Sequence, residues 1–338
     1  MSQWEELFAR AARRAIPIEV MIELTHHCNF RCEHCYIPDF SAPDLLPTGR
    51  VLELLEELAA MGTLVLALSG GELFLRRDWR EIATRARELG FDLHLFTNGS
   101  RITPADAAAI AALDATTHVS FYSREEARFD RFTAHPGSYR EVVRGIGLLR
   151  AAEVKTILKV PLMNWNLGEA QAIADWAKEI GAECRLSPFI TAKKDGDTRP
   201  LALRVLHEDL VRELGGPVLG CHDAGEARVR DPEAPLCAAA SRYACITPAG
   251  DVMACNILPG ADGNIRARTF RDVWENSAWL GKIRALRERD LPVCSTCSRL
   301  SYCGRCTAQA LVEDGDLVGP SRHAQRRAEL IEAARASG

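Results

Sequence analysis

Short apolar runs alternate with amphipathic stretches through the first half of the chain. Between the runs, apolar residues recur at helical spacing, as at Val51, Leu54, Leu55 and Leu58. Repeated strand–helix units of this kind predict an α/β fold with a parallel sheet and right-handed crossovers, either doubly wound or curled into a barrel. The expected strands are residues 18–24, 64–69, 91–96, 117–121, 154–160 and 182–186.

The alternation stops near residue 190. Residues 201–214 have the pattern of one connecting helix, and from about residue 234 Cys, Pro and Gly separate short elements. Such a loop-rich region buries little apolar surface, so we expect metal centres to hold it together. The expected parts are an N-terminal helix (1–16), a barrel-like domain (17–200), a linker (201–232) and a small C-terminal domain (233–338).

Composition and charge narrow the classes of function. Of 338 residues, 47% are hydrophobic, as in a globular protein. The balance of 42 Lys and Arg against 46 Asp and Glu gives no sign of nucleic-acid binding. No apolar stretch approaches the length of a membrane span. The first residues lack the apolar segment of a signal peptide, which predicts a cytoplasmic protein.

Twelve cysteines are therefore expected in a reducing compartment, where clustered thiols bind metal or do redox chemistry more often than they form disulfides. Cys28, Cys32 and Cys35 directly follow the first strand, at the sheet edge where active sites of parallel α/β folds gather. Two metal centres fit this spacing. One is zinc with His26, His27 or His34 as a fourth ligand, and the other is an iron–sulfur cube with one open iron.

Polar and glycine residues also end the next three strands. The second strand ends in Ser-Gly-Gly-Glu at residues 69–72, the third in Thr-Asn-Gly at 97–99, and the fourth carries Ser120. Each feature alone fits an ordinary turn. Together they lie on the same rim as the three cysteines, which favours one site.

The CxxxCxxC spacing together with Gly-Gly-Glu resembles the radical S-adenosylmethionine (SAM) superfamily. This resemblance implies a partial (β/α)6 TIM-like barrel and a [4Fe-4S] cluster on Cys28, Cys32 and Cys35. It implies that SAM binds at the open iron and is cleaved to a 5′-deoxyadenosyl radical that abstracts hydrogen. The resemblance makes Gly70, Gly71 and Glu72 contacts to the amino end of SAM, places Tyr36 near the adenine, and assigns Asn98 and Ser120 by strand position.

Seven more cysteines lie between residues 237 and 306. Their CxxC pairs also fit zinc ribbons, although seven ligands are one too few for two tetrahedral sites. The segment resembles the SPASM extension of radical enzymes that mature peptides, which implies two auxiliary iron–sulfur clusters. The first would be held by Cys237, Cys245, Cys255 and Cys306, and the second by Cys294, Cys297 and Cys303.

The second auxiliary cluster lacks its usual fourth cysteine. Gln325 occupies the place where the eighth cysteine of the family is expected, and His323 and Asp316 are the alternative ligands. The cluster would then either keep an open iron for a substrate group or an electron carrier, or be structural.

The resemblance implies a peptide maturase that abstracts hydrogen from a ribosomally made precursor peptide, with crosslinking, epimerisation or oxidation as the outcome. The turn at Cys245 is most similar to the maturases of mycofactocin and pyrroloquinoline quinone precursors. Asn256 stands where sulfatase maturases carry an Asp base. Because Asn cannot accept a proton as that Asp does, a sulfatase-maturase function is less favoured. Two alternatives remain, a radical dehydrogenase or tailoring enzyme for a small molecule and a zinc-stabilised binding protein.

Three residues are candidates for catalysis beyond the cofactor sites. Cys184 on the sixth strand could donate hydrogen or be an ordinary buried thiol. Glu23 shares a strand face with Glu19 and Met21, and His94 shares one with Asp92 and Phe96, so both candidates either line a cavity or form satisfied polar pairs. Two weaker features are Cys-His-Asp at residues 221–223, which is a poor nucleophile pattern, and Lys-Lys-Asp at 193–195, which we expect to be a solvated turn.

The expected partners follow from the same resemblance. About 16 residues precede the first strand, too few for the winged-helix domain that recognises leaders in many relatives. We therefore expect a separate leader-recognition protein or direct leader binding. A flavodoxin- or ferredoxin-type protein is the expected electron donor.

Overall fold

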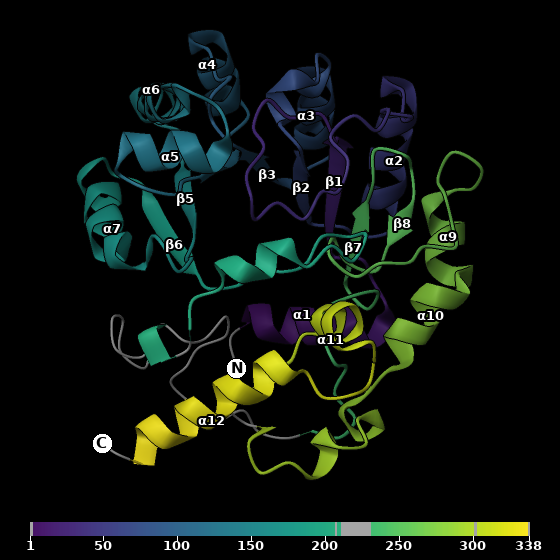
Figure 1. Cartoon of the computed structure of the whole chain (residues 1–338). Coiled ribbons are helices and arrows are strands. Elements are labelled where there is room, and N and C mark those ends of the chain that lie inside the picture. The colour runs from purple at the N-terminus through teal and green to yellow at the C-terminus, as the bar shows by residue number, and fades with distance from the viewer. Residues whose placement is uncertain (1–2, 207, 211–230, 301–302, 337–338) are drawn as a thin grey trace.

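The computed structural model describes residues 3–206, 208–210, 231–300 and 303–336, and an eight-stranded sheet organises it (Figure 1). The strand order is β6-β5-β4-β3-β2-β1-β7-β8, so the sheet has two free edges and the barrel is not closed. Neighbours from β6 to β7 are parallel, and β8 pairs antiparallel with β7. The strands are β1 (Glu19–Thr25), β2 (Val65–Gly70), β3 (Asp92–Thr97), β4 (Thr116–Ser120), β5 (Thr156–Pro161), β6 (Glu183–Ser187), β7 (Tyr243–Ile246) and β8 (Val252–Met253).

The predicted α/β class with six parallel strands is confirmed. Strands β7 and β8, however, come from the C-terminal region and extend the same sheet beyond β1. They span only four and two residues, too few for an alternating pattern to be visible in the sequence. The sheet therefore continues across the boundary expected near residue 233.

Helices follow most strands and cover the outer face of the sheet (Figure 1). In the first two thirds of the chain they are α1 (Gln3–Arg14), α2 (Thr48–Ala60), α3 (Trp79–Glu88), α4 (Pro104–Ala112), α5 (Glu126–Thr133), α6 (Ser138–Ala151) and α7 (Ala170–Glu179), with 3-10 turns η1 (Leu73–Leu75), η2 (Leu167–Glu169) and η3 (Arg199–Leu203). The C-terminal region adds α9 (Phe270–Asn276), α10 (Ala278–Ala285), α11 (Thr307–Asp314) and α12 (Arg322–Ala336), with 3-10 turns η5 (Glu288–Asp290) and η6 (Cys294–Thr296).

Strand alternation separates the core from the inner face of the sheet. In β1, Val20, Ile22 and Leu24 are buried in the core cluster that includes the apolar side of α2. Residues between them, such as Met21 and Glu23, point to the opposite, inner face. Capping residues stabilise the start of α4. Thr103 and Asp106 form a reciprocal capping box there.

The single helix expected at residues 201–214 is interrupted within its described part. The 3-10 turn η3 forms, residues 204–206 have no helical structure, and residues 208–210 are helical. The reason is tertiary: the Arg204 guanidinium donates to both carboxylate oxygens of Glu313 at 2.7 and 2.6 Å and to the carbonyl oxygen of Ile190. These contacts hold Arg204 in an extended conformation, which overrides its helical propensity.

No helix within the described ranges is long and apolar enough to cross a membrane.

Candidate functional site

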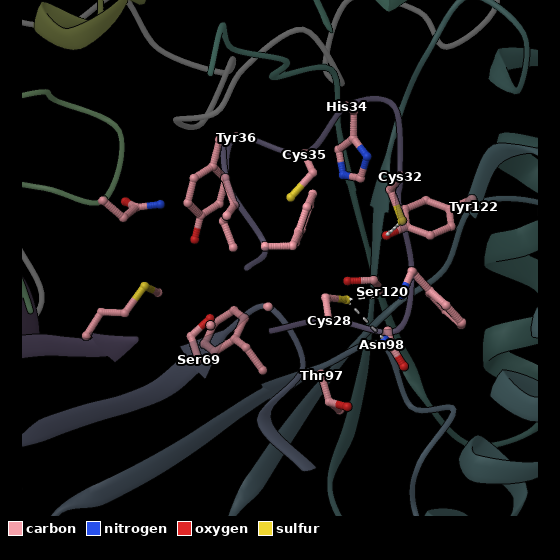
Figure 2. A pocket seen from close by; sticks show the side chains of 18 residues that line it. Cys28, Cys32, His34, Cys35, Tyr36, Ser69, Thr97, Asn98, Ser120 and Tyr122 are labelled. Atoms are coloured by element: carbon pink, nitrogen blue, oxygen red, sulfur yellow. Dashed lines mark hydrogen bonds between the residues drawn. The ribbon is translucent and has the colours of Figure 1, made fainter. Parts of the chain in front are cut away.

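Three cysteines surround one cavity at the carboxyl edge of the sheet (Figure 2). β1 ends at Thr25, and the loop that follows carries Cys28, Cys32 and Cys35, which all line this cavity of about 270 Å³. None of the three forms a disulfide. The structure therefore brings together three thiols that the sequence separates only by loop residues.

The electrostatics of these thiols fit a metal centre. Burial raises the pKa of Cys28 to about 11 and also raises the pKa values of Cys32 and Cys35. Thiolates at such sites need a nearby cation, and bound iron would replace the thiol protons. Within the described residues, no three His, Cys, Asp or Glu side chains gather closely enough to hold a single metal ion. Three cysteine thiols on one cavity are the type of ligand that an iron–sulfur cluster takes.

Paired glycines let the end of β2 approach this loop. A Cβ on Gly70 would lie 2.2 Å from the carbonyl oxygen of Thr25, and one on Gly71 would lie 2.3 Å from that of His27. Gly70 also has a φ of +143°, which L side chains rarely adopt. Both glycines line the cavity, so a ligand there meets bare backbone.

Glu72 lies outside the cavity and binds two residues of its wall. Its carboxylate is fully buried and accepts from the Thr97 hydroxyl at 2.7 Å and from the backbone N–H of Asn98 at 2.7 Å. It also caps η1 through the N–H of Phe74. Thr97 and Asn98 line the cavity whereas Glu72 does not, so Glu72 fixes the turn after β3.

Other residues assigned through the resemblance also line the cavity. Asn98, Ser120 and Tyr36 are among its walls. The Asn98 amide donates to Asn29 at 3.0 Å and lies 3.9 Å from Cys28 Sγ. The Tyr36 hydroxyl donates to Glu23 at 2.8 Å, which turns it away from bulk solvent.

Sequence reasoning missed an aromatic wall on the far side of the cysteines. The His34 ring stacks on Phe132 and meets the edge of Tyr122, with both centroid distances 5.3 Å. Burial lowers the pKa of His34 to about 4, so the ring is neutral, and its Nδ1 has no partner among the described residues. His34 and Tyr122 line the cavity, but nothing in the sequence pairs them because they come from distant segments.

Lys194 is not part of a solvated turn, which corrects that expectation. Its Nζ donates to both carboxylate oxygens of Glu23, at 2.9 and 2.7 Å, and lies 5.0 Å from the centroid of the Tyr36 ring. Its backbone N–H donates to the Tyr36 carbonyl. A buried carboxylate needs such a partner, and Glu23 draws Lys194 inward. Glu23 therefore occupies a satisfied ion pair rather than an open cavity wall.

The other two catalytic candidates lie elsewhere. Cys184 is paired in register with Leu158, a core residue, and packs against the core cluster on the helix-covered face. The structure does not bring Cys184 to the cavity. His94 lies on the inner face and contacts His118 and Asp92. Residues 221–223 lie outside the described residues.

Charge interactions connect the later cysteines in two groups. Burial, then the charges of Cys306 and Cys237, raises the pKa of Cys255 to about 12. Burial, then the charge of Glu23, also raises the pKa of Cys245, and Cys255 adds to the shift. Cys245 is paired in register with Met21, which lines the cavity, so this first group adjoins the site.

The second group lies farther along the C-terminal region. Burial and then the charges of Cys294 and Cys297 raise the pKa of Cys303. Cys294 packs in a small apolar cluster with Val318, whose N–H donates to Asp316 at 2.9 Å. Gln325 is exposed on α12.

Comparisons with known proteins agree with this geometry. Residues 22–177 match the family model of the Radical SAM superfamily, and residues 237–298 match SPASM, an iron–sulfur cluster-binding domain. The chain is 26% identical over 324 residues to AdoMet-dependent heme synthase of Methanosarcina barkeri, covering 88% of this chain and 93% of the relative. It is also 26% identical over 333 residues to PqqA peptide cyclase of Methylocella silvestris, covering 91% and 87%.

A solved structure shares the fold. Streptococcus suis SuiB bound to the precursor peptide SuiA superposes with a TM-score of 0.75 at 15% identity, covering 95% of this chain and 80% of that one. The likeness therefore extends over both cysteine regions.

Proposed function

The chain belongs to the radical SAM superfamily with a SPASM domain, and from this membership we propose that it reductively cleaves SAM and abstracts hydrogen from a ribosomally made precursor peptide. The observation that carries the proposal is the convergence of Cys28, Cys32 and Cys35 on the cavity that Gly70 and Gly71 line. A [4Fe-4S] cluster held by these cysteines would supply the electron that splits SAM into methionine and a 5′-deoxyadenosyl radical.

The chain's own residues account for binding and orientation around that chemistry. Bare backbone at Gly70 and Gly71 admits a polar ligand end, and Asn98 and Ser120 offer hydrogen bonds beside it. His34 and Tyr122 form an apolar and aromatic wall that excludes water from the opposite side. Water exclusion matters because a carbon-centred radical would otherwise react unproductively.

Two observations support a peptide substrate. A relative of comparable length is named PqqA peptide cyclase, and the SuiB structure holds a precursor peptide. We further propose that the first cysteine group holds one auxiliary cluster, and that Cys294, Cys297 and Cys303 hold a second with a ligand other than cysteine. A flavodoxin- or ferredoxin-type donor would supply electrons, and a separate protein would recognise the leader.

A small-molecule substrate is the second candidate. The observation that favours it is the relative named AdoMet-dependent heme synthase, which the chain matches along most of both lengths. The same cavity would serve with either substrate, because both candidates begin with the cleavage of SAM there.

The test begins with anaerobically reconstituted protein. We expect about twelve iron atoms per chain, and 5′-deoxyadenosine on addition of SAM and dithionite. The variant with Cys28, Cys32 and Cys35 all changed to Ala should form none, whereas Cys184→Ala should match the wild type. Zinc in place of iron, or 5′-deoxyadenosine from the triple variant, would refute the proposal.

The substrate class is tested separately. Peptides encoded beside the gene and porphyrin precursors are each added to the reconstituted enzyme, and 5′-deoxyadenosine formation is compared with the rate without addition. Stimulation by a peptide together with a mass change in it supports the first candidate. Stimulation by porphyrin precursors alone supports the second.

A further inference from the structure

Three side chains on the inner face of the sheet form a chain of hydrogen bonds. The Nε2 atom of His94 lies 3.2 Å from Asp92 Oδ2, and its Nδ1 atom lies 2.8 Å from His118 Nε2. The chain runs from the Asp92 side chain, 66% exposed, to His118, which is 4% exposed. It therefore connects solvent with the interior.

The protons of this chain have one consistent order when both rings are neutral. A carboxylate only accepts, so Nε2 of His94 carries the proton and Nδ1 of His94 is an acceptor. Nε2 of His118 must then donate to His94, which leaves Nδ1 of His118 as a bare lone pair. That Nδ1 is buried and has no hydrogen-bond partner among the described residues.

His118 lies next to the walls of the cavity. Its ring stacks flat on Phe96, with centroids 4.3 Å apart and planes 3° apart, and Phe96 lines the cavity. Ser120, two residues further along β4 and on the same strand face, lines the cavity as well. The unpartnered acceptor thus belongs to the inner face beneath the site.

We propose that His118 Nδ1 is the proton acceptor of the reaction, and that His94 and Asp92 are positioning residues that pass the proton on to solvent. This inference rests on the proposed function and deepens it, because a built-in acceptor is needed when the substrate is oxidised. After hydrogen abstraction, the substrate radical would lose one electron to an oxidised iron–sulfur cluster and one proton to His118. An epimerisation, in which the radical is quenched by a hydrogen atom, needs no such acceptor.

The surroundings favour a relay over a stored charge. Burial, then the charges of His94, Lys159, Arg185 and Lys155, lowers the pKa of His118 to about 3. The ring therefore stays neutral at ordinary pH and its acceptor stays available. A proton accepted at Nδ1 of His118 does not remain there. The proton on Nε2 of His118 moves to Nδ1 of His94, and the proton on Nε2 of His94 moves to Asp92 and then to solvent.

The first experiment reads the proton positions directly. In full-length reconstituted enzyme labelled with ¹⁵N-histidine, we expect His118 to carry its proton on Nε2 and none on Nδ1 from about pH 6 to about pH 8. A proton on Nδ1 in the wild type would overturn the proposal, whatever the substrate. This readout does not depend on SAM cleavage.

The second experiment separates hydrogen abstraction from proton removal. His118→Phe keeps a flat ring against Phe96 but removes the acceptor. With a deuterated form of the peptide that stimulates the wild type, we expect deuterium in 5′-deoxyadenosine at near the wild-type rate and modified peptide lowered about 100-fold. Asp92→Asn should lower the rate at which modified peptide forms and leave the KM for the peptide unchanged.

The control is Thr117→Val, which changes the neighbouring residue on the opposite face of β4. It should keep the wild-type ratio of 5′-deoxyadenosine to modified peptide. Equal loss of both products in His118→Phe would indicate a purely structural role and overturn the proposal, as would an unchanged yield of modified peptide. If the wild type forms no 5′-deoxyadenosine, the proposed function itself fails.

Discussion

Lys194 and Glu23 form a buried ion pair although 171 positions separate them. Both carboxylate oxygens of Glu23 accept from Lys194 Nζ, and the side chains are 0% and 10% exposed. Because Glu23 lies on β1 and Lys194 on the segment after β6, the pair closes that segment over the strand ends. It also holds the hydroxyl of Tyr36, a cavity wall.

Removing one partner of this pair should cost much more than removing a surface lysine. Lys194→Met leaves the Glu23 carboxylate buried without its main partner, so we expect the free energy of unfolding to fall by about 3–5 kcal/mol. Denaturant unfolding of the reconstituted protein measures the change. The matched control is Lys193→Met, because Asp197 keeps its pair with Arg199 and the loss should stay within about 1 kcal/mol. Equal losses in the two variants would contradict the prediction.

The same pair predicts a dependence of stability on pH. Burial alone would raise the pKa of Glu23, but His26 and Lys194 hold it below its usual value of 4.5. A lowered pKa means that the stabilisation is complete above about pH 4.5 and is lost as the pH falls through the folded-state pKa. Glu23→Gln should therefore flatten the acid limb of a plot of unfolding free energy against pH. An unchanged acid limb would show that other carboxylates govern it.

The sequence predicted the parts of the fold that depend on local patterns. The six parallel strands were placed within two residues of their observed bounds, because each is a short apolar run between stretches of helical pattern. β7 and β8 were missed since they are short, and β7 is stabilised by pairing with β1 and β8 by pairing with β7 rather than by a pattern of their own. The helix expected at residues 201–214 is interrupted at residues 204–206, because the sequence near Arg204 does not reveal its contact with the distant Glu313.

The candidate site divides in the same way. Cysteine spacing and strand-end glycines are local signals, so the cavity walls Cys28, Gly70 and Asn98 were predictable. Lys194 and His118 were not, because their roles depend on partners on other strands and loops. Polar residues on the inner face acquire a role only once the sheet sets their register.

The paired glycines should be intolerant of any side chain. In Gly71→Ala, the new Cβ would meet the carbonyl oxygens of His27 and His26 at 2.3 and 2.5 Å. These are backbone atoms of the cysteine loop, so the loop must shift, and we expect loss of the cluster that we propose there. Iron content and 5′-deoxyadenosine formation measure this. Gly49→Ala in α2 is the control, because a Cβ at that position would have no neighbouring atom within 4 Å, and the variant should behave as the wild type. Full iron and activity in Gly71→Ala would contradict the prediction.

The two cysteine groups of the C-terminal region predict how iron losses combine. Cys255 is electrostatically coupled to Cys237 and Cys306, whereas Cys303 is coupled to Cys294 and Cys297. If each group holds one cluster, Cys237→Ala combined with Cys255→Ala should lose about four iron atoms per chain, no more than either change alone. Cys255→Ala combined with Cys303→Ala should lose about eight. Iron and sulfide assays of the reconstituted variants measure these losses. The control is Cys184→Ala, which removes a cysteine but should lose no iron. Additive losses within one group would show that its cysteines do not share a cluster.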